Sequence, residues 1–123
     1  MARILVIDDA VFMRKLFVDT LTGQGHEIVG EGRNAKEAVA KFNALKPDLM
    51  TMDIVMPRES GIDTPEAVRQ IIQENPNAKI IIISSQDQQD IITEMLKAGA
   101  CDFILKPFRR ETVIKTVNRI LGI

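Results

Sequence analysis

Polar side chains follow four apolar runs of the sequence, at the points where these runs end. They are three carboxylates, a hydroxyl and an amine: Asp8, Asp9, Asp53, Ser84 and Lys106. Taken singly, none of them is informative, because an Asp beside a turn or before a helix is ordinary capping chemistry. Four polar ends in one short chain are more than a purely structural sheet needs.

The combined chemistry of these groups is consistent. Three neighbouring carboxylates would repel one another and would have raised pKa values unless a cation shared their site. An all-oxygen donor set without His or Cys suits a hard divalent ion, and Mg²⁺ fits best because it keeps room for water and phosphate oxygens. Lys106 offers a mobile positive charge for a phosphoryl group, and the Ser84 hydroxyl can bond one of its oxygens. The pattern describes an aspartate, Asp53, that receives a phosphoryl group.

The elements that must position these residues alternate five times between strand and helix. Short apolar runs predict strands at Arg3–Ile7, His26–Gly30, Leu49–Met52, Lys79–Ile83 and Phe103–Leu105, each followed by a helical pattern. Such alternation favours a parallel sheet with helices on both faces. In an open sheet of this kind the chemistry gathers beyond the carboxyl ends of the strands, where the polar residues lie.

Local signals predict where helices start. Asn34 can cap a helix, with Glu37 in a position resembling a capping box. Thr64 is the candidate cap of a later helix that has Pro65 at its first position. The apolar positions of the first helix recur with helical spacing at Val11, Phe12, Leu16, Phe17 and Leu21.

Composition excludes several classes of protein. The 123 residues are 46% hydrophobic and 27% charged, which suits one globular domain, and a net charge of −1 provides no general attraction to nucleic acid or to a membrane surface. The strand-like start leaves no room for a signal peptide, and no apolar stretch approaches a membrane span, so a cytoplasmic location is expected. The single Cys101 is expected to be a small buried residue, and His26 an ordinary surface residue.

The motifs resemble the receiver domains of two-component response regulators over Ile4 to Leu121. The shared motifs are Asp8-Asp9, Met52-Asp53 with Met56-Pro57 and Gly61, Ser84, and Lys106-Pro107-Phe108. Among receivers, the chain is most similar to the stand-alone chemotaxis type. The resemblance implies a flavodoxin-like (CheY-like) (βα)5 fold, with a parallel five-stranded sheet of order 2-1-3-4-5 and helices on both faces. It also implies a single receiver domain over residues 1–123, without an output domain.

The same resemblance implies roles for the acidic residues. Asp53 is expected to be the phosphoacceptor for a sensor histidine kinase. Mg²⁺ would be held by Asp53, by Asp9 directly, by Asp8 through water, and by the backbone carbonyl of Val55. Lys106 would contact the phosphoryl group.

The resemblance further implies a switch and its partners. Ser84 would move inward to bond the phosphoryl oxygen, and Phe103 would turn into the space released. The switched surface is expected to bind a downstream protein, with the flagellar motor switch as a candidate, and a phosphatase is a second candidate partner. No nucleic acid and no membrane insertion are expected. Lys106-Pro107 is a candidate cis peptide. The chain is not expected to be an enzyme beyond self-catalysed phosphotransfer and autodephosphorylation.

Other functions remain open at this stage. A Mg²⁺-dependent phosphohydrolase with Asp53 as nucleophile would need a second carboxylate two residues later, where the chain has Val55. A flavin or nucleotide binder would need small residues in place of Asp8 and Asp9. A constitutive interaction module and a receiver of a relay outside chemotaxis are further alternatives. Ser60 and Pro65 depart from the common receiver pattern. Apolar Val55 predicts that loss of the phosphoryl group depends little on that side chain.

Overall fold

The computed structural model describes residues 1–56 and 61–123, and strands and helices alternate through them. The strands are β1 (Arg3–Ile7), β2 (Glu27–Gly32), β3 (Leu49–Asp53), β4 (Ile80–Ser85) and β5 (Asp102–Lys106). The helices are α1 (Val11–Thr22), α2 (Ala35–Leu45), α3 (Thr64–Glu74), α4 (Gln89–Ala98) and α5 (Arg110–Leu121). All strand pairs are parallel, in the order β2-β1-β3-β4-β5, so the predicted topology is confirmed.

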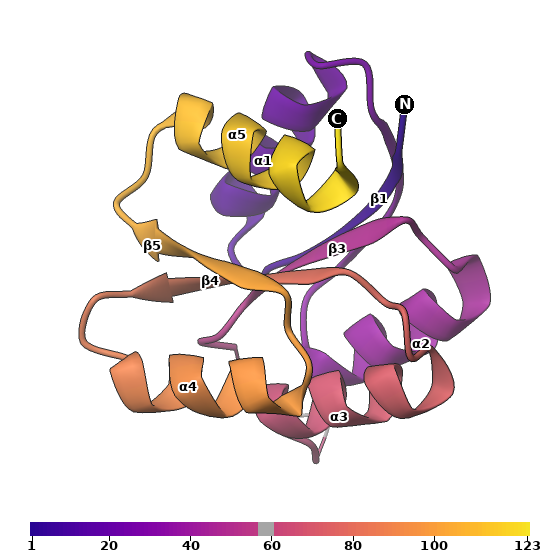
Figure 1. The fold of residues 1–123 in the computed structure, drawn as a ribbon, viewed down its shortest axis with the longest axis vertical. Coiled ribbons are helices and arrows are strands. Elements are labelled where there is room, and N and C mark those ends of the chain that lie inside the picture. Colours follow the sequence, from indigo (N-terminus) through magenta and orange to yellow (C-terminus); the bar gives the residue numbers. More distant parts are fainter. Residues whose placement is uncertain (57–60) are drawn as a thin grey trace.

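The sheet is the middle of three layers. Helices α1 and α5 cover one face, and α2, α3 and α4 cover the other (Figure 1). Each face has its own apolar core, one built around Phe17 of α1 and one around Phe42 of α2. All five residues of β3 are buried, because the central strand is covered on both faces. The end of β3 is therefore a sheltered place for a polar group.

The helix starts differ in detail from the sequence signals. The Asn34 side chain accepts a hydrogen bond from the main-chain amide of Glu37 at 2.8 Å, as predicted. The Glu37 side chain in turn accepts a hydrogen bond from the main-chain amide of Arg33 at 3.0 Å. The predicted Thr64 cap is wrong by one residue. Asp63 accepts from the Glu66 amide at 2.9 Å, and Thr64 is already helical. Asp and Thr are both favourable N-cap residues. Asp63 is the cap because its backbone is extended, whereas Thr64 is the first helical residue.

Two expectations about burial are wrong, those for His26 and Cys101. Val11 and Phe12 share the helical spacing of the first helix but are 70% and 79% exposed, because α1 packs on the sheet through its later turns. His26 is buried, and its Nδ1 accepts a hydrogen bond from the Ala2 amide at 3.2 Å. Cys101 is exposed because it lies in the turn between α4 and β5.

Candidate functional site

The polar residues at the strand ends do meet at one edge of the sheet. Asp53 is the last residue of β3 and Lys106 the last of β5, and Lys106 Nζ lies 3.1 Å from Asp53 Oδ2. The Val55 amide donates to Asp53 Oδ1 at 3.2 Å. Asp53 is only 4% exposed, so both of its oxygens are held in a sheltered, polar position. The contacts with Lys106 and with the Val55 amide thus fix the position of the Asp53 carboxylate.

Packing beyond β5 anchors the segment that carries Lys106. The Lys106–Pro107 peptide is cis, as the family resemblance predicted. The ring of Phe108 packs against that of Phe17 on α1, with the ring centroids 5.2 Å apart. The two rings are tilted by 53°, and inclined contacts at this distance are favourable for aromatic pairs. The Lys-Pro-Phe motif thus ties the end of β5 to the neighbouring helix.

Asp8 is the most electrostatically perturbed group of the site. It is 1% exposed; its Oδ1 accepts from the Ala10 amide at 2.9 Å, whereas its Oδ2 has no hydrogen-bond partner among the described residues. Burial raises the pKa of Asp8 to about 6; the Ala10 hydrogen bond opposes this rise, and the negative charge of Asp53 adds to it. A buried oxygen without a partner is costly, so this position favours a cation.

Asp8, Asp9 and Asp53 form a three-carboxylate cluster. One oxygen from each lies within 4.8 Å of the others, and Asp9 is exposed while the other two are buried. The donors are all oxygens, the Asp8 carboxylate also carries the unpartnered Oδ2, and the exposed side leaves room for water. This set fits a hard divalent ion such as Mg²⁺ and does not fit a soft metal.

Arg14 supports the turn that carries the cluster. Its Nη1 donates to the main-chain carbonyl of Asp8 at 2.8 Å, and its Nε pairs with Glu31 of β2 at 3.2 Å. The Asp8 amide also donates to the carbonyl of Gly32 at 3.0 Å. Residue types do not predict the contact between Arg14 and the Asp8 carbonyl, because every residue has a main-chain carbonyl. The one signal in the sequence is that Arg14 falls in the first turn of α1, shortly after the acidic pair.

Ser84 lies on β4, the strand next to β3, but its hydroxyl makes hydrogen bonds away from Asp53. It is fully buried, and its Oγ lies 3.0 Å from the Ser85 carbonyl and 2.9 Å from Gln88 Oε1. Among the described residues, no hydrogen bond joins it to Asp53. Phe103 is half-buried and packs against the core under α2, α3 and α4. The switch roles of Ser84 and Phe103 stay predictions.

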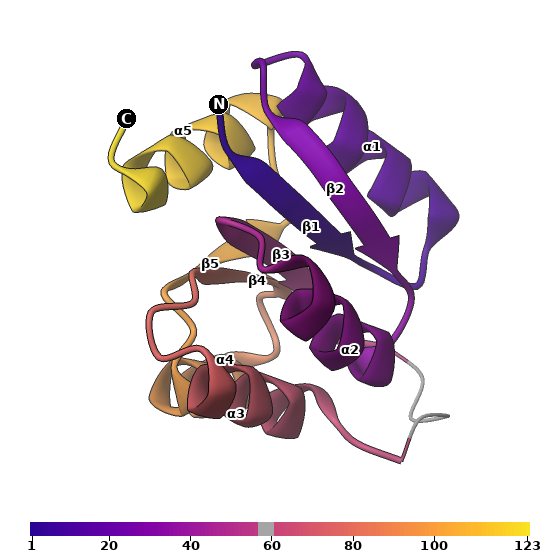
Figure 2. The same cartoon turned by 90° about the vertical axis from the view of Figure 1, so that its right-hand side faces the viewer.

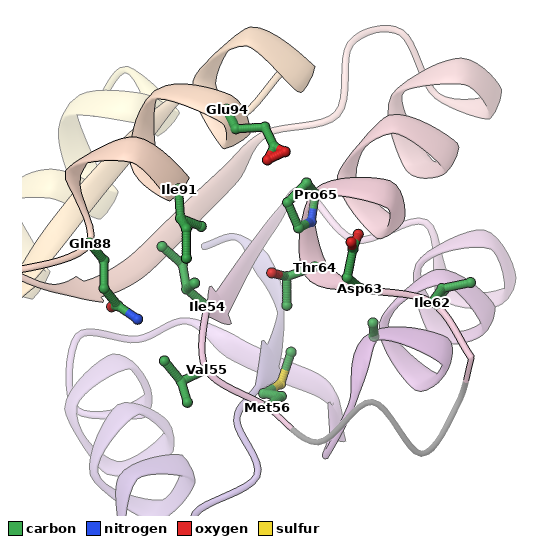
Figure 3. A pocket seen from close by; sticks show the side chains of 11 residues that line it. Ile54, Val55, Met56, Ile62, Asp63, Thr64, Pro65, Gln88, Ile91 and Glu94 are labelled. Carbon is green, nitrogen blue, oxygen red and sulfur yellow. The ribbon is translucent and has the colours of Figure 1, made fainter.

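The loop after β3 is only partly described. Val55 is 60% exposed and Met56 half-buried, and Gly61 has the positive φ of 82° that glycine adopts easily. Pro57 of the Met-Pro motif and Ser60 lie outside the described residues. A cavity of about 190 Å³ lies between this loop and α4, lined in part by Val55, Gln88 and Ile91 (Figure 3).

No helix in the described part of the chain is long and apolar enough to cross a membrane.

Comparison with known proteins gives consistent matches. Residues 4–118 match the family model of the response regulator receiver domain. The chemotaxis protein CheY of Thermotoga maritima is 48% identical over 118 residues, 96% of either chain, and CheY of Bacillus subtilis is 43% identical over 98% of either chain. Among solved structures, a chain of the CheX-CheY-BeF3-Mg+2 complex from Borrelia burgdorferi aligns with a TM-score of 0.87 and 30% identity, over 96% of this chain and 87% of that one.

Proposed function

This chain belongs to the family of response regulator receiver domains, and from that premise we propose that Asp53 accepts a phosphoryl group from a sensor histidine kinase. The chain is a phosphorelay response regulator homologous to the chemotaxis protein CheY. The observation that carries the proposal is the 3.1 Å pair of Asp53 and Lys106 beside two further carboxylates.

Asp53, Lys106 and the Val55 amide have different roles in the phosphoryl transfer. One oxygen of Asp53 forms the bond to phosphorus while the bond from phosphorus to the donor nitrogen breaks, and the electron pair leaves with the donor. Lys106 gives up its ion pair with Asp53 and forms an ion pair with the incoming phosphoryl oxygens, which carry more negative charge. The Val55 amide holds the second Asp53 oxygen and so fixes the direction of the carboxylate.

Asp8, Asp9, Asp53 and the backbone carbonyl of Val55 would hold Mg²⁺. The bound ion would supply positive charge that offsets the negative charge of the phosphoryl group. The unpartnered Asp8 Oδ2 and the mutual proximity of the three carboxylates support this assignment. Asp8 is the most buried of the three carboxylates, and its raised pKa means that a cation competes with a proton for this group.

Phosphorylation would switch a surface formed by α4, β5 and α5. The Ser84 hydroxyl moves to a phosphoryl oxygen, and Phe103 turns inward into the space that this movement opens. The changed surface binds a downstream protein, with the flagellar motor switch as the candidate target, and a phosphatase resets the site. The Borrelia burgdorferi complex supports binding to a partner protein, because its CheY is in a complex with a second protein, CheX, together with BeF3 and Mg.

The site is built to hold a phosphoryl group and not to turn over substrates. The reaction is limited to phosphotransfer onto the chain itself and its autodephosphorylation, in a cytoplasmic setting. A general phosphohydrolase would need an acid or base beside Asp53, and the residue two positions on is the apolar Val55. This difference disfavours the enzyme alternative.

Beryllofluoride binding tests the proposal. It mimics a phosphoryl group on a carboxylate, and calorimetry should show stoichiometric binding only when Mg²⁺ is present. The Asp53→Asn variant should not bind, and Asp19→Asn, at an exposed position on α1, should bind as the wild type does. Binding that survives Asp53→Asn or chelation of Mg²⁺ would contradict the proposed site.

A further inference from the structure

The loop that follows β4 contains an acceptor that competes for the Ser84 hydroxyl. Gln88 Oε1 lies 2.9 Å from Ser84 Oγ and 2.9 Å from the Ser85 amide. The main-chain N–H of Gln88 also donates a hydrogen bond to the Ser85 carbonyl at 3.2 Å. The side chain and main chain of Gln88 thus close a small ring with the end of β4, and the Ser84 hydroxyl is part of it.

The donors around Gln88 Oε1 show which serine hydroxyl depends on this acceptor. The Gln88 oxygen has two lone pairs, but the Ser85 hydroxyl also lies within 2.9 Å of it, so three donors converge on two acceptor positions. Ser85 Oγ has an alternative acceptor in Asp87 Oδ1 at 2.7 Å. Ser84 is fully buried, and its remaining acceptor is the adjacent Ser85 carbonyl. Gln88 is therefore the side-chain acceptor that holds Ser84.

The surroundings of Gln88 allow it to release Ser84. Its side chain lines the cavity of about 190 Å³, facing Ile91 and the Val55 region across open space (Figure 3). The side-chain amide of Gln88 thus borders a space into which it can turn. Gln88 also precedes the first residue of α4 without making a side-chain cap bond to the helix, so turning it does not uncap α4.

We propose that Gln88 is a positioning residue that holds the Ser84 hydroxyl away from Asp53 in the unphosphorylated protein. The inference rests on the proposed function, because Ser84 must leave Gln88 to bond a phosphoryl oxygen. Each phosphorylation then breaks one hydrogen bond before it gains another. The strength of that bond sets part of the equilibrium between the two positions of Ser84.

The test replaces Gln88 by Met, which has a similar shape but no amide oxygen. Because a neutral hydrogen bond contributes modestly to stability, Gln88→Met should tighten beryllofluoride binding at saturating Mg²⁺ by about 2- to 10-fold. Gln89→Met, the same substitution one residue along at an exposed position, should leave the affinity unchanged. A merely structural role for Gln88 would weaken binding and would not tighten it.

A double-mutant cycle isolates the path through Ser84. In a Ser84→Ala background, Gln88→Met should have no effect on beryllofluoride affinity, because no hydroxyl remains to be released. Equal tightening in both backgrounds, or unchanged or weaker binding by Gln88→Met alone, overturns the role of Gln88 while the proposed function stands. Failure of the wild type to bind beryllofluoride would overturn both.

Discussion

Asp8→Asn removes a carboxylate that burial penalises, and its effect on stability can be worked out from the pKa. The pKa of Asp8 is about 6 in the folded protein against 3.8 for an ordinary Asp. Because the folded value is the higher one, the folded state binds the proton more tightly than the unfolded state does. The folded protein therefore loses stability from this group as the pH rises from the lower value to the higher, and the loss is complete above both values.

The size of the loss follows from the same two values. At 1.36 kcal/mol per pKa unit, the full penalty amounts to about 3 kcal/mol, of which about 2 kcal/mol falls between about pH 4.5 and pH 7.5. Asn carries no charge, and its Oδ1 can still accept from the Ala10 amide. The unfolding free energy of the metal-free wild type, relative to that of Asp8→Asn, should therefore fall by about 2 kcal/mol over this pH range.

Chemical denaturation followed by far-ultraviolet circular dichroism measures this difference, since the chain has no Trp or Tyr for fluorescence. EDTA keeps the protein metal-free, and Asp19→Asn, exposed on α1 and outside the acidic cluster, is the control. Saturating Mg²⁺ should then stabilise the wild type by binding to the folded state, and should stabilise Asp8→Asn much less. A difference between wild type and Asp8→Asn that does not change with pH would refute the reasoning.

Three further substitutions test separate parts of the site. Lys106→Met removes the charged partner 3.1 Å from Asp53 and should slow phosphorylation by acetyl phosphate about 10- to 100-fold, whereas a rate near that of the wild type would contradict the role of the lysine. Arg14→Met should weaken Mg²⁺ binding about tenfold in calorimetry because it frees the Asp8 carbonyl, with Arg33→Met at an exposed position as the control; equal affinities would show that the contact is incidental. Val55→Ala should leave the dephosphorylation rate within about twofold of the wild type, since an apolar side chain takes no part in proton transfer; a large change would reject that view.

Much of the fold follows from the sequence because strand and helix patterns alternate without interruption. The isoleucine run of β4 and the apolar run of β3 have both faces covered, so their burial could be predicted from composition alone. The polar ends of β1, β3 and β5 could be placed together because parallel strands share one carboxyl edge. Asp53 and Lys106, 53 residues apart, are in contact for this reason.

The features that the sequence did not predict depend on single contacts. Whether Asp63 or Thr64 caps α3 is a choice between two suitable neighbours, and His26 is buried because its ring nitrogen finds the Ala2 amide. Gln88 and Arg14 act through hydrogen bonds to a loop hydroxyl and a main-chain carbonyl, which no periodicity reports. Such contacts require the three-dimensional path of the loops.

The central claim is that Asp53 becomes phosphorylated, and peptide mapping tests it most directly. The protein is incubated with acetyl phosphate and Mg²⁺, digested at acidic pH, where an acyl phosphate survives, and analysed by mass spectrometry. We predict a single phosphoryl group on the peptide that contains Asp53, lost after treatment with base and absent without Mg²⁺ or in Asp53→Asn. A stable phosphoryl group on any other residue, or labelling of Asp53→Asn equal to that of the wild type, would contradict the account.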